Sequence, residues 1–180
     1  MKPTEIQQIT VGPAVPGDVI GMQEVFYQAW LATYPNEEFG ITRNDIEERY
    51  KDRLSPEVLA KRTERLLRPT EDGITLIAKE NEKVIGLCQM IRHSDHNQLR
   101  AIYLLPEYQG RGIGTMLWDE AKKCIDTSLQ SIVSVATYNT NAIKFYERLG
   151  FVPTGKTWRD EKFKMKSGAV IPEMEMILKP

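Results

Sequence analysis

The sequence contains few of the residues from which metal centres and disulfide scaffolds are built. Only two of its 180 residues are cysteines and two are histidines. Cys88 and Cys124 lie far apart in apolar segments, and neither belongs to a CxxC pair. Because free cysteine is among the most frequently buried residue types, the sequence favours two buried thiols over a redox or zinc site. We therefore expect no metal.

Long apolar runs and an excess of one charge are also missing. No run approaches the ~20 apolar residues that a membrane-spanning helix needs, and residues 1–11 lack the apolar core of a signal peptide. The formal net charge is −1, without the basic excess typical of proteins that bind nucleic acid. These absences predict a cytoplasmic protein that binds neither membranes nor nucleic acid.

The residues that are present have the composition of an ordinary globular domain. Hydrophobic residues make up 41% of the chain and charged residues 27%, far from the values of disordered or fibrous chains. A chain of 180 residues is long enough to bury a core without disulfides or metal. We therefore expect a single domain over residues 1–180.

The first part of the chain predicts one strand followed by three helices. The strand is expected over residues 6–14. Helix starts are expected at Asp18, Thr42 and Ser55, whose side chains can accept hydrogen bonds from free amides. Thr42 and Asp45 together resemble a capping box, with Asp in place of Glu.

From residue 74 onward, strands are expected to alternate with helices. Two β-rich runs around Asn81 and Glu82 predict an antiparallel hairpin over residues 74–92. Further strands are expected over residues 98–106, 131–137, 151–155 and 169–178, with helices over residues 113–124 and 141–150. This order predicts an α/β fold in which a mixed sheet carries helices on both faces.

A turn with three glycines, QGRGIG at residues 109–114, joins an expected strand to an expected helix. Glycines permit positive φ and leave no Cβ in the way, so successive N–H groups can turn toward one anion at the positive end of the helix. The pattern therefore indicates a phosphate-binding loop. A tight turn that needs small residues only for packing is the alternative that the glycines alone leave open.

Two familiar phosphate loops fit this turn poorly. A Walker loop requires Gly-Lys-Ser/Thr, whereas Gly114 is followed by Thr115 and Met116. A dinucleotide-binding turn requires GxGxxG and an acidic residue about 20 positions later, and the chain has GxGxG with no acid over residues 131–135.

The remaining pattern, Q/R-x-x-G-x-G/A, is supplied by Gln109, Gly112 and Gly114. With LRAIYLLPEYQGRGIG leading into it and NTNAIKFYERLGF after it, the chain resembles the GNAT superfamily of N-acetyltransferases, most specifically over residues 98–152. The resemblance implies an α/β fold whose mixed sheet is largely antiparallel and has about six to seven strands. It also implies an enzyme that uses acetyl-CoA.

The resemblance assigns a cofactor site to two strands and the turn. In that family, backbone amides of the turn bind the pyrophosphate of acetyl-CoA, the preceding strand runs beside the pantetheine arm, and an asparagine after the next strand binds that arm. The implied cofactor-binding residues are Ile102, Tyr103, Leu104, Gln109, Gly110, Arg111, Gly112, Ile113, Gly114, Thr115 and Asn139. Asn139 is equally suited to cap the helix that follows it.

Tyr146 is the implied catalytic residue. Family members often use the tyrosine of this helix to protonate the thiolate of departing CoA. Ala142, Phe145, Tyr146 and Leu149 also form the apolar stripe of a core helix, so a packing role is the alternative. A buried phenol needs a polar partner, which the sulfur would supply, and this favours the catalytic interpretation.

No general base is evident in the sequence. Many relatives place an acid at the start of the strand before the loop, and here Gln98 and Arg100 stand there. His93, Asp95 and His96 just upstream, and Tyr34, Glu37 and Glu38 after the first helix, are the other groups within reach, and proton removal through water is equally compatible.

The acceptor is expected to bind at the first two helices, the variable region of this family. The loop YPNEEFG at residues 34–40, together with Asp45, Glu47 and Glu48, places negative charge there, which favours a cationic amine. The layout loosely resembles small bacterial polyamine acetyltransferases, and a protein amine is the other acceptor left open.

We therefore predict direct transfer of an acetyl group from acetyl-CoA to a primary amine, without a covalent enzyme intermediate. The alternative is a module that binds CoA or acyl-CoA without turnover, which the missing acid at residue 98 favours. Another nucleotide-phosphate ligand is a third hypothesis. Dimers are common in the family, so a homodimer is compatible with the resemblance.

Overall fold

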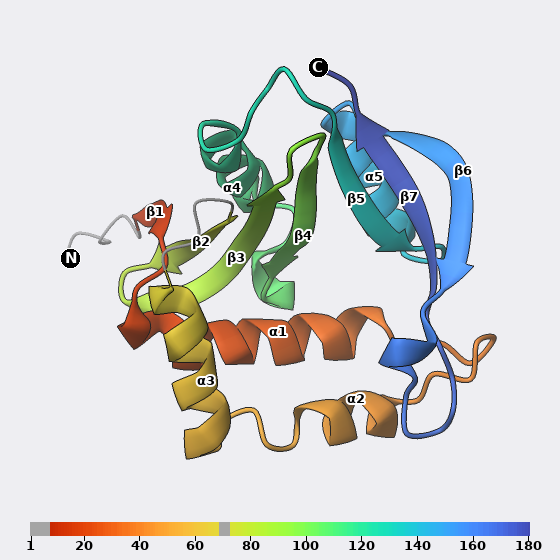
Figure 1. Cartoon of the computed structure of the whole chain (residues 1–180). Coiled ribbons are helices and arrows are strands. Elements are labelled where there is room, and N and C mark those ends of the chain that lie inside the picture. Colours follow the sequence, from red (N-terminus) through yellow and green to blue (C-terminus); the bar gives the residue numbers. More distant parts are fainter. Residues whose placement is uncertain (1–7, 69–72) are drawn as a thin grey trace, which may run out of the picture.

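The chain forms one seven-stranded sheet with helices on both faces (Figure 1). The computed structural model describes residues 8–68 and 73–180. The helices are α1 (Val19–Thr33), α2 (Arg43–Tyr50), α3 (Pro56–Leu67), α4 (Ile113–Lys122) and α5 (Thr140–Arg148). The strands are β1 (Ile9–Pro13), β2 (Gly73–Glu80), β3 (Lys83–Arg92), β4 (Asn97–Leu104), β5 (Ser131–Ala136), β6 (Val152–Arg159) and β7 (Pro172–Leu178).

The sheet has the order β1-β2-β3-β4-β5-β7-β6. Only the β4–β5 pair is parallel, and every other neighbouring pair is antiparallel. The prediction of a mixed, largely antiparallel sheet is therefore confirmed. The first strand was expected over residues 6–14 and is observed at Ile9–Pro13, while residues 6 and 7 lie outside the described part of the chain.

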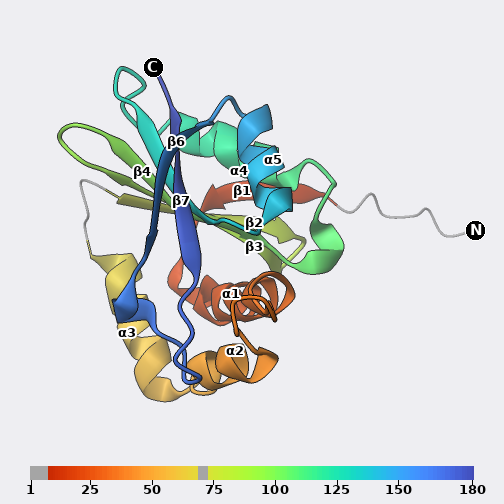
Figure 2. The same cartoon turned by 90° about the vertical axis from the view of Figure 1, so that its right-hand side faces the viewer.

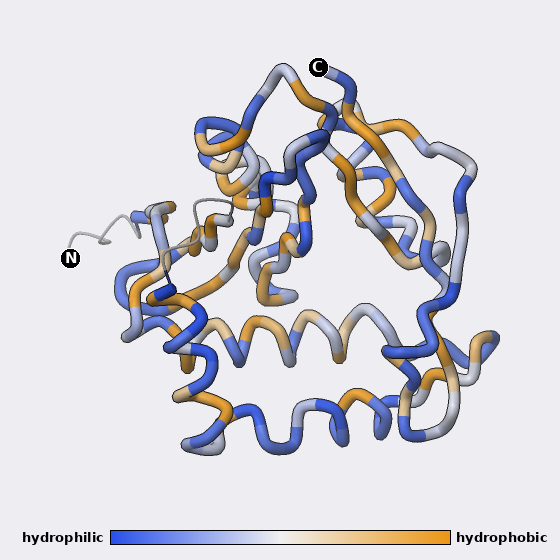
Figure 3. The backbone as a smooth tube through the Cα atoms, viewed as in Figure 1, coloured by the Kyte–Doolittle hydropathy of each residue, from blue (hydrophilic) through white to orange (hydrophobic). Residues whose placement is uncertain are grey.

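Two helical layers cover the sheet. Helices α1, α2 and α3 lie on one face, and α4 and α5 lie on the other (Figure 2). The core is built mainly from β3 and the apolar faces of α1 and α4, where Leu87, Leu117 and Trp118 are buried. Trp118 of α4 packs edge-on against Phe151 with ring centroids 5.4 Å apart. Figure 3 shows the corresponding apolar colour along β3, whereas α2 is mostly polar.

Two of the three predicted helix caps are present, whereas Asp18 precedes α1 without capping it, because its carboxylate accepts from the Val15 amide at 2.9 Å instead. Thr42 accepts a hydrogen bond from the Asp45 amide, and the Asp45 carboxylate accepts one from the Thr42 amide, which completes the capping box. Ser55 accepts from the Val58 amide at 3.3 Å. These local bonds explain why α2 and α3 begin where the sequence predicted.

Strands β4 and β5 pair over a short stretch only. Their parallel pairing runs from Asn97 opposite Ser131 to Leu99 opposite Val133, although β4 continues to Leu104. Figure 1 shows the two strands together at the top of the view and apart at the bottom. The later half of β4 therefore has a paired edge toward β3 and an unpaired edge toward β5.

A β-bulge marks the point of separation. Leu99 lies opposite Met90 and Ala101 lies opposite Gln89, so Arg100 is an extra residue on β4. A bulge redirects a side chain and increases strand twist, and bulges are common beside active sites.

Across residues 8–68 and 73–180, no helix combines the length and apolar character needed to cross a membrane.

Candidate active site

The three glycines of the turn between β4 and α4 serve two different purposes. Gly110 and Gly112 have φ of +74° and +80°, and a Cβ added to either would meet no atom within 4 Å. Open space beside two glycines with left-handed backbone leaves room for a ligand to approach the main chain, and we call residues 110–115 the glycine cradle. Gly114 instead lies in α4, where an added Cβ would lie 3.2 Å from the Phe145 ring of α5. The first two glycines thus shape the turn, and the third allows two helices to approach.

The amides of this turn point to a site for an anion. Helix α4 begins at Ile113 without a side-chain cap, and the Met116 amide donates to the Gly112 carbonyl at 3.1 Å. The three preceding amides, at residues 113–115, have no acceptor in an α-helix. The Gln109 amide is different, because it donates to the Pro106 carbonyl at 3.2 Å. The available donors therefore lie at residues 110–115, where the helix end adds positive charge.

An ion-pair network holds the turn against β2. The Tyr108 hydroxyl donates to the Glu80 carboxylate at 2.6 Å, and an Arg111 guanidinium nitrogen lies 3.6 Å from the same carboxylate. The Arg111 guanidinium also lies 4.9 Å from the centre of the Tyr108 ring. Arg111 is therefore directed at Glu80, so its side chain fixes the turn while its amide is part of the cradle.

The unpaired edge of β4 carries main-chain groups of alternate residues. The Leu105 amide donates to the Ile85 carbonyl of β3 at 2.9 Å. Because bonding directions alternate along an antiparallel pair, the main chain of Tyr103 also faces β3, whereas that of Ile102 and Leu104 faces the edge that β5 leaves open. Two of the three residues predicted on this strand thus present backbone groups to the opening.

Tyr103 belongs to a group of tyrosines at the opening. Its ring packs edge-on against Phe26 of α1, with centroids 5.7 Å apart, and its hydroxyl lies 2.9 Å from that of Tyr34. Burial raises the pKa of Tyr34, and the nearby Tyr103 raises it further. Burial likewise raises the pKa of Tyr103, although hydrogen bonds with Tyr34 and Trp30 oppose the change. Both phenols therefore stay neutral.

Tyr146 approaches this group from the opposite face of the sheet. It lies on α5, is only 6% exposed, and packs against the rings of Phe145 and Phe151. Burial raises the pKa of its phenol, and the neighbouring Tyr103 and Cys88 raise it further. The hydroxyl forms no hydrogen bond with any described residue. It is a protonated phenol without a protein partner, directly beside the open end of β4.

Asn139 caps α5, as one of its two predicted roles required. Its side-chain oxygen accepts a hydrogen bond from the Ala142 amide at 3.1 Å, and its own amide donates to the Ala136 carbonyl at 2.9 Å. These bonds fix Asn139 directly after β5, across the opening from β4. Its side-chain NH₂ group bonds no described residue and can serve a ligand at the same time.

Comparison with known proteins identifies the family. The sequence profile of the Acetyltransferase (GNAT) family matches residues 26–151, which is most of the chain. The chain belongs to the GNAT family of acetyltransferases. The glycine turn, the parted strands and Tyr146 all lie within the matched region.

Individual relatives agree with this assignment. An uncharacterised N-acetyltransferase of Methanocaldococcus jannaschii is 33% identical over 95 residues, a stretch that covers 48% of this chain and 42% of that protein. The chain therefore spans less than half the length of this curated relative.

Two solved structures share the fold. The PaiA N-acetyltransferase of Thermoplasma acidophilum, crystallised with coenzyme A, is 25% identical over 96% of this chain and 99% of its own, with a TM-score of 0.71. The acetyltransferase yncA of Salmonella typhimurium, solved with acetyl-CoA, is 22% identical over 96% and 94%, with a TM-score of 0.62.

The sequence did not reveal one residue of the candidate site, Glu173. It lies on β7 opposite Ala136 at the end of β5, is half-buried, and forms no ion pair with any described residue. Burial raises the pKa of its carboxyl, while a hydrogen bond with Trp158 opposes the change. Its charge acts on Tyr34 and Tyr103, which places it at the tyrosine group. The alternating PEMEMIL pattern predicted the strand, but nothing in it indicated which acid faces the opening.

The upstream candidates for a base lie elsewhere. His93, Asp95 and His96 form the turn before β4, at the opposite end of that strand from Tyr103. There His96 pairs with Asp95 at 2.8 Å, and His93 lies 3.4 Å from the Gln98 side chain. The structure does not bring these residues to the tyrosine group.

The expected negative charge at the acceptor region is largely neutralised. Asp45 is 2% exposed and accepts hydrogen bonds from Thr42 and Ser167. Glu47 pairs with Arg43, and Glu48 pairs with Lys166 and Lys51. These three acids have structural partners, whereas Glu37 and Glu38 of the preceding loop are exposed and form no ion pair with any described residue. The attraction of a cationic amine stays a prediction.

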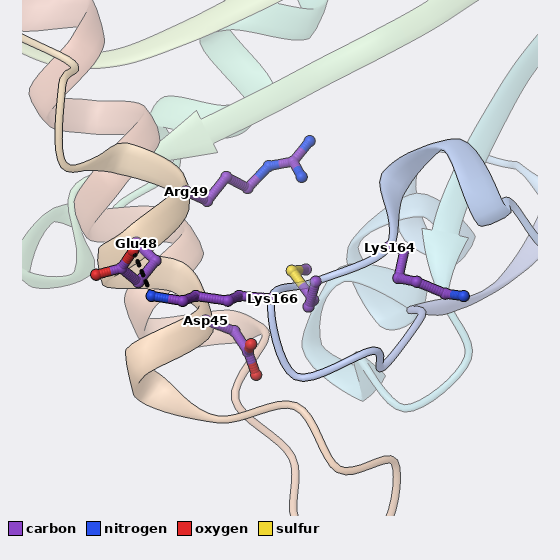
Figure 4. Close-up of a pocket in the computed structure, with 6 residues that line it drawn as sticks. Asp45, Glu48, Arg49, Lys164 and Lys166 are labelled. Carbon is purple, nitrogen blue, oxygen red and sulfur yellow. Dashed lines mark hydrogen bonds and ion pairs between the residues drawn. The ribbon is translucent and has the colours of Figure 1, made fainter.

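A pocket of about 220 Å³ lies between α2 and the segment before β7. Six residues line it: Asp45, Glu48, Arg49, Lys164, Met165 and Lys166. Figure 4 shows the Glu48–Lys166 pair at its edge, with Arg49 pointing away from the Glu48 carboxylate. The Arg49 guanidinium lies 4.9 Å from the centre of the Trp30 ring instead.

Proposed function

We propose that this single-domain protein transfers the acetyl group of acetyl-CoA directly to a primary amine. The observation that carries the proposal is the set of amides at residues 110–115, which face open space beside the unpaired edge of β4. Membership in the GNAT family supports acetyl transfer as the reaction class. The identity of the acceptor is the finer part of the proposal.

Residues on both sides of the opening would hold the cofactor. The amides of residues 110–115 suit its diphosphate, because several donors and a helix end converge on one anion. The main chain of Ile102 and Leu104 suits the amide-containing arm, as does the free NH₂ group of Asn139. Gln109 would contribute through its side chain, since its amide is occupied.

The chemistry requires two proton movements. Acetyl-CoA supplies the acetyl group as a reactive thioester. When an amine forms a bond to the acetyl carbon, its nitrogen must lose a proton, and Glu173 is the acceptor we propose, directly or through water. As the carbon–sulfur bond breaks, Tyr146 would donate its proton to the sulfur. A phenol kept protonated by burial suits the role of proton donor, and a carboxyl whose pKa burial raises is a stronger base than a solvated one.

Tyr103 would serve the acceptor side of this reaction. Its main chain faces β3, and its hydroxyl is bonded to Tyr34 on the side of the sheet that α1 covers. The pair of phenols lies where a proton from the amine must pass toward Glu173, so a water held by Tyr34 and Tyr103 would complete the path.

Titration calorimetry with acetyl-CoA and thiol release with a panel of amines test the proposal. We expect binding at micromolar concentrations and release of one thiol for each acetylated amine. Absence of binding at hundreds of micromolar would remove the cofactor assignment. Binding without thiol release for any amine would instead support a CoA-binding module without turnover, and tighter binding of ATP or NAD would indicate another nucleotide ligand.

A further inference from the structure

Three arginines from three different elements lie on the acceptor side of the sheet. They are Arg49 on α2, Arg62 on α3 and Arg100 on β4, and we call them the arginine patch. All three side chains are exposed. Within residues 8–68 and 73–180, none of them lies within 4.0 Å of a carboxylate, whereas Arg43, Arg53, Arg68 and Arg111 each do. The three guanidinium groups of the patch therefore carry positive charge that no described carboxylate neutralises.

Several contacts show that the three arginines share one neighbourhood. The Arg49 guanidinium stacks 4.9 Å from the Trp30 ring, whose centroid lies 5.6 Å from that of Tyr50. Tyr50 is close enough to Arg49 and Arg62 for both charges to act on its phenol. Partial desolvation lowers the pKa of Arg62, and the charges of Arg65 and, less strongly, Arg100 lower it further. The patch thus spans α2, α3 and β4, with Arg49 and Arg62 beside Tyr50 and Arg100 beside Arg62.

The β-bulge brings Arg100 into this neighbourhood. Arg100 is the extra residue of the bulge and directly follows Leu99, the last residue of β4 that pairs with β5. A bulge changes the direction of the side chain at that position. The positive charge therefore stands where the two central strands begin to separate, on the same strand as Tyr103.

Much of the negative charge on this side has a structural partner. Asp45, Glu47 and Glu48 are bound to Ser167, Arg43 and Lys166, so they leave little free negative charge at the surface. Glu173 is the unpaired carboxylate at the tyrosine group, with Tyr34, Tyr103, Trp158 and Asp160 as its electrostatic neighbours. Glu37 and Glu38, in the loop after α1, are the exposed acids on this side that form no ion pair with any described residue. The arginine patch and Glu173 thus supply charges of opposite sign on the acceptor side.

We propose that the acceptor is a small amine that also carries a carboxylate or a phosphate group, which the arginine patch binds while the amine reaches Glu173. The inference rests on the proposed acetyl transfer and names the class of its acceptor. Guanidinium groups bind carboxylates and phosphates through two parallel hydrogen bonds, and no described carboxylate competes for these three. A polyamine lacks the anionic group and would meet repulsion at the patch.

Matched amines test the charge preference. The rate of thiol release is measured with 4-aminobutyrate, butylamine and putrescine, and with 2-aminoethyl phosphate and ethylamine. We expect kcat/KM about 10-fold or more higher for an anionic amine than for its matched neutral or cationic amine, the usual effect of a charge-assisted contact. The two anionic compounds also show whether carboxylate or phosphate is preferred.

Single substitutions localise the effect. Arg62→Gln and Arg100→Gln should each raise KM for the preferred anionic amine by about 10-fold, with kcat and butylamine turnover little changed. Arg92→Gln is the control, because Arg92 is exposed at the far end of β3 and also has no carboxylate partner among the described residues. Unchanged affinity for acetyl-CoA in all three variants shows that the cofactor site is intact.

The outcomes separate this inference from the proposed function. Equal or faster turnover of putrescine and butylamine would overturn the acceptor class while acetyl transfer stands. Equal losses for anionic and neutral amines in Arg62→Gln and Arg100→Gln would also overturn it. No thiol release with any amine, despite acetyl-CoA binding, would overturn acetyl transfer itself and this inference with it.

Discussion

The two faces of the sheet bind in different ways. On the face of α4 and α5, the candidate site consists mainly of main-chain groups from one continuous stretch, residues 102–115. On the face of α1, α2 and α3, it consists of side chains from α1, α2, α3, β4 and β7. Backbone donors suit a ligand that is the same throughout a family, whereas side chains can be exchanged one at a time. We therefore expect the cofactor side to be the constant part of the molecule and the acceptor side the variable part.

The largest effect is expected from a charge placed in the glycine cradle. Gly112→Asp adds a carboxylate where φ is +80° and the donors converge, so repulsion and backbone strain should weaken CoA binding by about 100-fold or more in calorimetry. Gly155→Asp is a matched control, since Gly155 has φ of +85° and equally open surroundings on β6. A similar loss of affinity in both variants would contradict the cradle.

Loss of the proposed base should be the next largest effect. Glu173→Gln should lower kcat by about 10²-fold to 10⁴-fold, the usual range for a general base. Because the raised pKa of Glu173 sets where its carboxylate becomes protonated, activity of the unaltered protein should fall as pH drops through that value. The variant should lack this acidic limb in a pH profile of thiol release.

Glu175→Gln is the control for that measurement. Glu175 lies two residues further along β7 and pairs with Lys156 at 3.1 Å. Its replacement should leave the pH profile unchanged. If both variants kept full activity, Glu173 would have no part in proton removal, and the water path past Tyr34 would be the alternative.

Loss of the proposed acid should have a smaller effect. Tyr146→Phe keeps the ring that packs against Phe151 but removes the proton donor, so kcat should fall by about 10²-fold with little change in CoA affinity. Tyr27→Phe, on the outer side of α1 beneath Arg53, should change neither quantity. Full turnover by Tyr146→Phe would assign this tyrosine to packing alone.

The smallest effect concerns the stability of the acceptor side. The Asp45 carboxylate accepts hydrogen bonds from Thr42 and Ser167, which join α2 to the segment before β7. Asp45→Asn should lower the free energy of unfolding by about 1–3 kcal/mol in urea titrations. Glu47→Gln, which breaks an exposed pair with Arg43, should cost less than about 0.5 kcal/mol.

The stabilising effect of Asp45 should also depend on pH. Burial alone would raise the pKa of its carboxyl, but hydrogen bonds from Thr42 and Ser167 lower it from 3.8 to about 2. A carboxyl with a lowered pKa stabilises the fold above its ordinary value, and the contribution is lost as pH falls toward 2. The difference between Asp45→Asn and the unaltered protein should therefore shrink below pH ~4. A constant difference would mean that the lost bonds do not depend on the charge.

The cofactor side could be predicted from the sequence because its signals are local. The glycine spacing, the Asn139 cap of α5 and the alternation of strands with helices are each set by neighbouring residues. The turn at residues 109–114 therefore indicates an anion site from its residue pattern alone. The sequence pattern did not indicate that the Gln109 amide donates to the Pro106 carbonyl, because this bond depends on a short 3₁₀ helix at Pro106–Tyr108.

The acceptor side could not be predicted because its contacts join distant parts of the chain. Glu48 and Lys166 pair across 118 positions, and Ser167 binds Asp45 across 122. From the sequence alone, the acidic cluster therefore looks unpaired, because these partners lie more than 100 positions away and are known only from the fold. Likewise, Arg100 becomes part of a patch only through a bulge, and Glu173 reaches the tyrosines only through the order of β5, β7 and β6.

The contact between Gly114 and Phe145 bears on the length of coenzyme arm that the protein can accept. Gly114 lies in the first turn of α4, within the glycine cradle, and Phe145 directly precedes Tyr146 on α5. The proposed anchor for the diphosphate and the proposed donor for the sulfur thus stand on two helices that approach each other at Gly114. A coenzyme analogue with a longer or shorter arm would bind through its diphosphate yet present its sulfur out of register, and a bulkier residue at position 114 would alter the same spacing from the protein side.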